Sequence, residues 1–207
     1  MSDFITLNPE DLSQQDNYKL LIGSVLPRPI AFVSTASPSG LTNLAPFSFY
    51  TGVCSNPPTL LFCPTVRGSD GAEKDTLRNI RETGEFVVNV VTEELVERMN
   101  QTAKELPYGE SEFDLVGLTV AKSLKVKAPR VLESPVSMEC RLQQYIHVGE
   151  PDAIGSGNVV LGTIVQFHIH KDLYEAGRID TEKLKPVSRL AGTSYAPVRE
   201  IFQLARP

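Results

Sequence analysis

The sequence predicts a mainly β protein, an antiparallel barrel that is closed or partly closed, with a few short helices. Seven segments carry strand patterns, and clusters of Gly, Pro, Asn or Asp separate most of them. Helical patterns are fewer. Many strands with proline-rich turns favour a barrel or a sandwich, and periodicity alone does not separate the two. The predicted strands are 28–35, 43–51, 59–63, 85–91, 118–126, 136–148 and 158–170.

The first two strands are typical of a β-hairpin, because residues 30–35 alternate as in a strand and the turn residues 37–40 (SPSG) follow. Pro46 stands within the second strand. Since proline has no N–H to donate to a neighbouring strand, we expect it on a sheet edge or at a bulge. Backbone groups beside Pro46 would then be free to meet a ligand. An edge proline is also an ordinary protection against aggregation, so both interpretations stay open here.

The strands 136–148 and 158–170 alternate clearly between apolar and polar residues. The loop 150–157 (EPDAIGSG) joins them, which predicts a second hairpin. We expect 136–148 to be half exposed, with Cys140 among the apolar residues that face the core. Its predicted polar face comprises Ser137, Glu139, Arg141, Gln143, Tyr145 and His147.

Two surface helices are predicted, with a third at the N-terminus. Residues 73–83 have helical spacing and stop at Gly84, which suits the position after a helix. Residues 93–105 follow Thr92, a residue type that caps helix starts. Residues 8–16 are the candidate third helix.

Length and composition bound the interpretation. A chain of 207 residues with 41% hydrophobic residues is long enough for one domain, which we take as 1–207. The net charge of −5 argues against a nucleic-acid partner. The start lacks a secretory signal and no apolar run suggests a membrane span, so we expect a cytoplasmic protein. Three cysteines without metal-type spacing are expected to be reduced.

The loop 67–76 (RGSDGAEKDT) combines glycines, cations and hydroxyls at the start of the predicted helix. Helix N-termini present free N–H groups, and Lys74 and Thr76 would add a charge and a hydroxyl donor, so the loop suits a phosphate. It is not a Walker A motif, because Asp75 separates the lysine from the threonine. A solvated loop is the alternative. Because a carboxylate would repel a phosphate, we expect Asp75 to cap the helix or orient Lys74.

Residues 28–35 (RPIAFVST) and 43–50 (NLAPFSFY) resemble the flavin reductase-like family of FMN-binding split-barrel proteins, which includes flavoredoxins and reductase components of two-component monooxygenases. The likeness covers nearly the whole chain. It departs at Ala191, where the family often has a glycine. Further stretches that are similar to the family, in the same order, are Lys74-Asp75-Thr76 with Asn79 and Ile80, residues 85–89, and Arg189-Leu190-Ala191-Gly192 with Tyr195.

The resemblance implies an antiparallel split β-barrel of Greek-key type, formed as a single FMN-binding domain over residues 1–207. It implies an NAD(P)H-dependent flavin reductase that passes hydride from NADH or NADPH to FMN, because the flavin itself carries this chemistry. A flavoredoxin-type electron carrier that binds FMN without NAD(P)H is the alternative, and a barrel with an empty site is a third reading. The resemblance also implies a homodimer and, as electron acceptor, a monooxygenase or another redox partner.

The site residues are carried over from the family one by one. Arg28, Arg189, Lys74 and Thr76 would address the phosphate, with Asp75 beside them; Asn43, Ala45, Pro46 and Ser48 would meet the ring edge; Thr35 would reach the ribityl chain or the phosphate. Either arginine, taken singly, would also suit a surface salt bridge. Tyr195 would pack over the flavin or seal the barrel, and Cys63 is an option for a flavin-facing position. No catalytic residue is named.

Metal binding is not predicted. His168 and His170 stand two apart on one predicted strand face, but no third ligand has a matching local spacing. Gly155-Ser156-Gly157 lacks the third glycine and the following helix of a dinucleotide-binding fingerprint. We therefore expect any nicotinamide cofactor to lie directly over the flavin.

Overall fold

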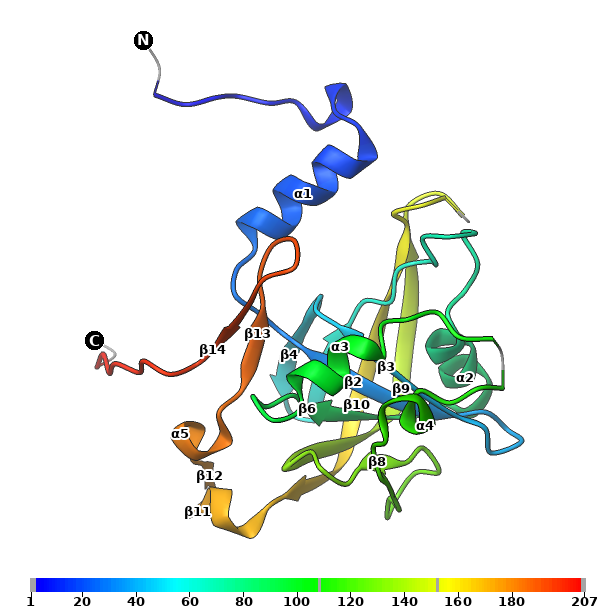
Figure 1. Cartoon of the computed structure of the whole chain (residues 1–207), viewed down its shortest axis with the longest axis vertical. Helices are drawn as coiled ribbons and strands as arrows, with labels where there is room; N and C mark the ends of the chain where they lie inside the picture. Colours follow the sequence, from blue (N-terminus) through cyan, green and yellow to red (C-terminus); the bar gives the residue numbers. More distant parts are fainter. Residues whose placement is uncertain (1–2, 108, 152, 206–207) are drawn as a thin grey trace.

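The computed structural model describes residues 3–107, 109–151 and 153–205. Over these residues the largest element is a seven-stranded antiparallel sheet, which confirms the mainly β prediction. Its order is β3-β2-β6-β9-β10-β5-β4, so β3 and β4 are free edges and the sheet does not close into a barrel (Figure 1). The strands are β2 (Ala31–Ala36), β3 (Thr42–Phe47), β4 (Tyr50–Ser55), β5 (Pro58–Phe62), β6 (Glu85–Val90), β9 (Val136–Val148) and β10 (Gly157–Ile169).

Both predicted hairpins are present. β2 pairs with β3 from Ala31↔Phe47 to Ala36↔Thr42, and β9 pairs with β10 along nearly their whole lengths. Because β3 is an edge strand, the expected edge position of Pro46 is confirmed. The predicted strand 43–51 was too long, since the chain leaves the sheet after Phe47 and β4 starts a new pairing with β5.

The sheet curls around an aromatic core that brings distant strands together. The Phe47 ring of β3 lies 5.1 Å from the Phe62 ring of β5, and Phe62 lies 5.4 Å from Phe86 of β6. Gly162 of β10 makes room for this cluster, because a Cβ there would overlap the ring of Phe86. The edge strand β3 therefore packs against β5 across the core without pairing with it.

Helix α2 (Asp75–Thr83) packs against this curled sheet and buries Leu77 and Ile80. The helix ends at Gly84, as the sequence predicted, and Gly84 has a left-handed φ of 71°. Lys74 occupies the position before the first helical residue, and its side chain makes no capping hydrogen bond.

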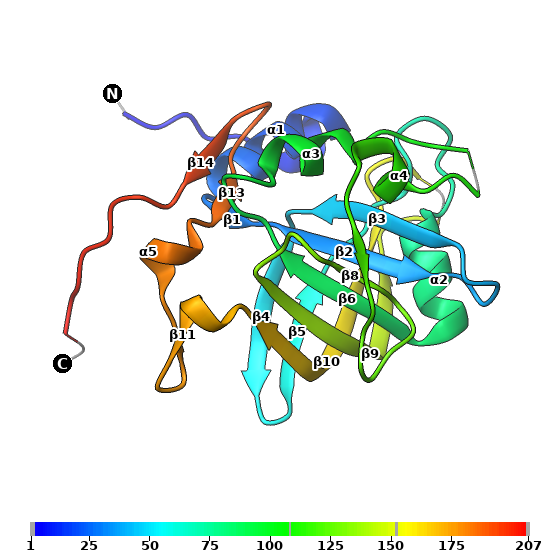
Figure 2. The same ribbon diagram turned by 60° about the horizontal axis from the view of Figure 1, so that its bottom comes forward.

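Helices α3 (Val96–Gln101) and α4 (Glu112–Val116) lie over the outer face of β2 and β3 (Figure 2). They bury Phe32 and Leu44 together with Met99 and Phe113, so β2 and β3 are covered on both faces. The predicted helix 93–105 is shortened at both ends. Leu95, and not Thr92, precedes its first helical residue.

The predicted strand 118–126 is wrong. In this region only two short strands form, β7 (Val120–Ala121) and β8 (Arg130–Val131), which pair with each other. An irregular loop joins them. The N–H groups of this loop are satisfied by carboxylates in place of a neighbouring strand, because Lys127 N donates to Glu85 Oε2 over 2.7 Å and the residues before it donate to Glu139.

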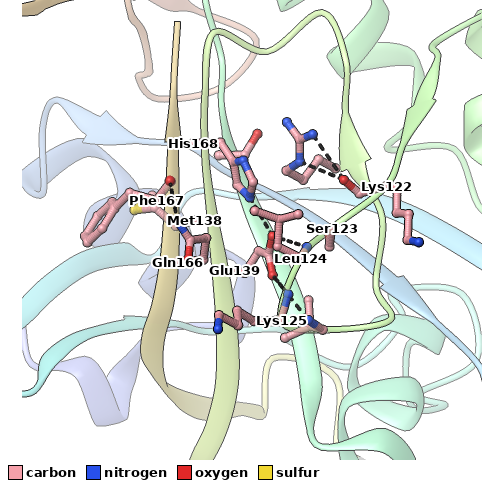
Figure 3. A network of polar contacts seen from close by, with 12 residues as sticks. Lys122, Ser123, Leu124, Lys125, Met138, Glu139, Gln166, Phe167 and His168 are labelled. Atoms are coloured by element: carbon pink, nitrogen blue, oxygen red, sulfur yellow. Dashed lines mark hydrogen bonds and ion pairs between the residues drawn. The ribbon is translucent and has the colours of Figure 1, made fainter.

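Glu139 is fully buried beneath that loop, whereas its alternation predicted an exposed polar face. Its carboxylate accepts the N–H groups of Leu124 at 2.7 Å, Lys125 at 2.6 Å and Val126 at 3.2 Å. His168 Nε2 lies 2.5 Å from Glu139 Oε1, the same oxygen that accepts the Leu124 N–H (Figure 3). A single carboxylate thus holds the loop on the sheet.

The chain ends form a separate layer on one side of the sheet (Figure 1). The predicted N-terminal helix 8–16 is a short 3₁₀ turn followed by a longer helix α1. No helix among the described residues is long and apolar enough to cross a membrane. The remaining elements are η1 (Pro9–Asp11), α1 (Gln14–Ser24), β1 (Arg28–Pro29), η2 (Lys171–Leu173), β11 (Tyr174–Glu175), β12 (Arg178–Ile179), α5 (Thr181–Leu184), β13 (Val187–Arg189) and β14 (Tyr195–Pro197).

Candidate functional site

Two adjoining cavities lie at the free edge of β3, and both are lined by Pro46, Phe47 and Ala103. The first cavity, about 90 Å³, is bounded by β3, the start of α2, residues 102–106 and Glu112. The second, about 200 Å³, lies towards β13 and β14. Of the predicted site residues, Asn43, Ala45, Pro46, Lys74, Asp75 and Thr76 line the first cavity, and Pro46, Ser48 and Arg189 line the second.

Two amide–hydroxyl hydrogen bonds fix α2 against the β2–β3 hairpin. Asn43 Nδ2 donates to Thr76 Oγ1 at 2.9 Å, and Asn79 Nδ2 donates to Thr35 Oγ1 at 3.0 Å. Thr35 and Asn43 are paired across the two strands, and Thr76 and Asn79 are one turn apart on α2. Because Thr76 Oγ1 accepts from Asn43, its own hydrogen stays available to donate into the first cavity.

Thr35 is fully buried and lines neither cavity. That it reaches the ribityl chain or the phosphate stays a prediction, and the contact that the structure shows is a supporting one. Its hydroxyl holds Asn79, and through Asn79 it holds the helix that carries Thr76.

The start of α2 offers several groups to an anion. Lys74 lines the first cavity, and no acidic group of the described residues pairs with it. The first helical hydrogen bond is donated by Leu77 to Lys74 O, so the N–H groups of Asp75 and Thr76 precede it and are unused by the helix. An ammonium, a hydroxyl and a helix N-terminus thus meet at one place.

Asp75 neither caps the helix nor orients Lys74, so that prediction is wrong. It is the first helical residue, and its carboxylate forms ion pairs with Arg67 at 3.3 Å and Arg78 at 3.0 Å. These two arginines offset the negative charge that Asp75 brings to the cavity.

Arg28 lines neither cavity, and its role toward the phosphate stays a prediction. Its buried guanidinium donates to the backbone carbonyls of Ile22 at 2.7 Å, Val25 at 2.8 Å and Leu190 at 2.9 Å. Its Nε lies 3.4 Å from Ser48 Oγ. Arg28 therefore joins the end of α1 to the segment that carries Arg189.

The second cavity has an aromatic wall. The Arg189 guanidinium lies 4.4 Å from the centre of the Tyr195 ring, and Tyr195 Oη donates to Asn100 Oδ1 at 2.7 Å. The left-handed φ of this turn, 59°, falls on Gly192, so Ala191 is accommodated without strain. Tyr18 of α1 also lines the cavity.

Glu112 is a lining residue of the first cavity that the sequence did not predict. Only 7% of it is exposed, and its Oε2 accepts the N–H of Leu44 on β3 at 2.9 Å. Burial raises the pKa of Glu112, and the nearby Asp75 carboxylate raises it further, whereas the hydrogen bond from Leu44 lowers it. No element is predicted over Ser111-Glu112, and no local pattern there indicates the cavity.

Other candidates lie outside the two cavities. Cys63 lines neither, and burial raises the pKa of its thiol. His168 faces Glu139, and His170 lies 3.7 Å from Asp172. Within the described ranges, no three His, Cys, Asp or Glu side chains gather as a metal site would require.

An open antiparallel sheet with two adjoining cavities at its edge strand β3, one of them at the start of helix α2, defines this class of β protein. Residues 22–184 match the model of the flavin reductase like domain. The chain belongs to this family, as the resemblance of its sequence motifs predicted.

Relatives agree over the whole length. A protein of Halalkalibacterium halodurans is 46% identical over 201 residues, which cover 97% of this chain and 96% of the relative. The crystal structure of nitrilotriacetate monooxygenase component B from Bacillus cereus has a TM-score of 0.93 at 41% identity and covers 99% of this chain and 100% of that one. A Shewanella frigidimarina protein with a split barrel domain, 23% identical, covers 99% and 100% with a TM-score of 0.84, which shows the shared fold alone.

Proposed function

We propose that this protein binds FMN and acts as an NAD(P)H-dependent flavin reductase. The observation that carries the proposal is the joined pair of cavities at the β3 edge, one suited to a phosphate and the other to a ring, in a chain of the flavin reductase like family. The first cavity, about 90 Å³, is the smaller of the two and lies at the start of α2, so we place the phosphate there.

The phosphate would be held by Lys74, the Thr76 hydroxyl and the free N–H groups at the start of α2. Arg189 lines the second cavity and not the first, so we assign it to the ring or to the nicotinamide. Asn43 would act through Thr76, whose hydroxyl it holds.

The ring edge would lie along β3. Leu44 N–H points away from β2, because it donates to Glu112, and alternation in an antiparallel pair turns the backbone groups of Pro46 the same way. Pro46 has no N–H, and the Leu44 N–H is taken. The cavity edge of β3 therefore offers carbonyl acceptors, which suit a heterocycle that carries an N–H donor.

A bound flavin would supply the hydride acceptor. The protein then needs only to bring the nicotinamide and the flavin into contact, which the second cavity between Ser48, Tyr18 and Tyr195 allows. This division of labour accounts for a site without a nucleophile or a general base.

The test is anaerobic mixing of protein and FMN with NADH or NADPH while flavin bleaching is followed. Rapid bleaching is expected. FMN binding without bleaching would reject the reductase and favour the flavoredoxin-type carrier, and a protein that binds no FMN would reject both. Lys74→Ala and Thr76→Ala should each weaken FMN binding about 10- to 100-fold, since each removes a bond to a charged group. Lys122→Ala, an exposed lysine outside both cavities, is the matched control.

We further propose that each chain forms a single split-barrel domain of Greek-key type over 1–207 and that two chains form a homodimer. We place the protein in the cytoplasm. Its electrons would pass to free flavin, a monooxygenase or another redox partner. Apolar side chains stand exposed on α1, such as Leu21 at 51%, and at the β9–β10 tip, where Ile146 is 45% exposed. Sedimentation should give a dimer, and Leu21→Glu with Ile146→Glu should give monomers. A wild-type monomer would overturn the dimer alone.

A further inference from the structure

The first cavity holds charges that do not balance one another. Arg67 is paired with Asp75, and Glu105 is exposed to solvent and accepts the Ser69 hydroxyl at 2.6 Å. Among the described residues, no ion pair involves Lys74, Lys104 or Glu112. Two unpaired ammonium groups and one buried, unpaired carboxylate therefore share a small cavity.

Glu112 is held so that it can exist in either protonation state. Its Oε2 accepts the Leu44 N–H, a bond that an ionised and a protonated carboxyl both make. Oε1 is the oxygen on which a proton can reside without loss of that bond. Burial already raises the pKa of this carboxyl above its ordinary value.

The charged groups around Glu112 come from three segments. Helix α2 and the residue before it bring Asp75, Arg78 and Lys74, the loop before α2 brings Arg67, and the segment after α3 brings Lys104 and Glu105. Strand β3 adds no titratable group to the cavity. Without a ligand, the nearby Asp75 carboxylate already opposes the ionised form of Glu112.

A phosphate monoester changes this balance. It adds about −1.5 to −2 charges to the cavity near neutral pH. The buried carboxylate of Glu112, which lines the same small cavity, is then close to a dianion. Like charges at short range favour the neutral form of a carboxyl.

We propose that Glu112 binds one proton from solvent, on Oε1, when the phosphate of FMN enters the first cavity, so that cofactor and proton bind together. The proposal rests on the proposed flavin function and adds a positioning residue to it. Glu112 holds α4 against β3 through its hydrogen bond with Leu44 in both states, and its negative charge is neutralised when the phosphate binds.

The expected pH dependence follows from this linkage. The contribution of Glu112 makes FMN binding tightest at low pH, at which Glu112 is already protonated in the free protein. As pH rises, this contribution weakens the affinity by up to about tenfold per pH unit until Glu112 is ionised in the complex too. The second ionisation of the phosphate, near pKa 6, acts in the opposite direction.

The test is calorimetric titration of the whole protein with FMN in buffers of different ionisation heat, which counts the protons taken up. Wild type should take up a fraction approaching one proton above the free pKa of Glu112. Glu112→Gln, which keeps an acceptor for Leu44, should lose that fraction. Glu110→Gln, with an exposed carboxylate two residues away and outside both cavities, should retain it. Equal uptake in Glu112→Gln and wild type would overturn the proposal.

Riboflavin, which lacks the phosphate, provides a second measurement that needs no variant. Wild-type protein should take up fewer protons with riboflavin than with FMN under the same conditions, and equal uptake would overturn the role of the phosphate. If wild type binds no FMN, the proposed function fails and this inference with it. If FMN binds without proton uptake that depends on Glu112, only this inference fails.

Discussion

Glu139 and Glu112 are both buried carboxylates, yet their surroundings shift their pKa values in opposite directions. Glu139 accepts three backbone N–H groups and faces His168, and although burial acts to raise its pKa, these partners together lower it (Figure 3). Glu112 accepts the N–H of Leu44, and although its backbone hydrogen bonds act to lower its pKa, burial raises it overall. The number of donors, and not depth alone, decides whether a buried carboxylate keeps its charge.

The largest effect is expected at Glu139. Glu139→Ala would leave three N–H groups and His168 without an acceptor, so we expect about 3–5 kcal/mol of lost unfolding free energy, measured by urea denaturation. Glu133→Ala is the matched control, because Glu133 accepts the Thr119 N–H at an exposed site and should cost less than about 1 kcal/mol. Similar losses in both variants would show that burial of Glu139 does not matter.

His168 is the next test of the comparison. His168→Ala removes one of the partners that keep Glu139 ionised and should cost about 1–3 kcal/mol. Hydrogen exchange should quicken at Leu124 and Lys125, whose N–H groups depend on the same carboxylate. His170→Ala, at an exposed position, should leave both quantities unchanged; quickened exchange there would contradict the assignment.

The pH dependence of stability should separate the two carboxylates. Because its folded pKa is lowered, Glu139 contributes stability above its unfolded pKa of about 4.3, and this is lost as pH falls through the folded value. Because its folded pKa is raised, the contribution of Glu112 is present below about pH 4.3 and is lost as pH rises through the folded value. Urea midpoints of Glu139→Gln and Glu112→Gln over acid to neutral pH should diverge from wild type in opposite senses.

The smallest effect is expected for Glu112→Gln at neutral pH without ligand. Glutamine keeps an acceptor for Leu44 and removes a buried charge, so stability should stay equal or rise by up to about 1 kcal/mol. Thermal unfolding measures this directly. A clear loss of stability would mean that the charge of Glu112 holds α4 on β3.

The sequence predicted the elements whose hydrogen bonds are made by regular pairing. The hairpin 136–148 with 158–170 and the helix ending at Gly84 were found almost residue for residue, because alternation and a C-terminal glycine act locally. Residues 118–126 also alternate, but the N–H groups of Leu124, Lys125 and Val126 are satisfied by Glu139. Nothing local indicates that a distant carboxylate replaces a strand.

The site was predicted in part for the same reason. The family motifs located Lys74, Thr76 and Pro46, which do line the cavities. They also suggested Arg28, whose charge is taken up by three carbonyls, and they passed over Glu112, which reaches the cavity only because α4 packs on β3. Which charged side chain is free to meet a ligand depends on tertiary contacts.

Arg28 makes its three strong bonds to backbone oxygen atoms and none to a side-chain carboxylate. Every amino acid carries a carbonyl, so Ile22, Val25 and Leu190 can be exchanged for other residues while the junction between α1 and the β13–β14 turn persists. Arg28 itself has no such freedom, because a lysine cannot reach three carbonyls with one ammonium in the same fork. Among related sequences we therefore expect positions 22, 25 and 190 to vary and position 28 to remain arginine.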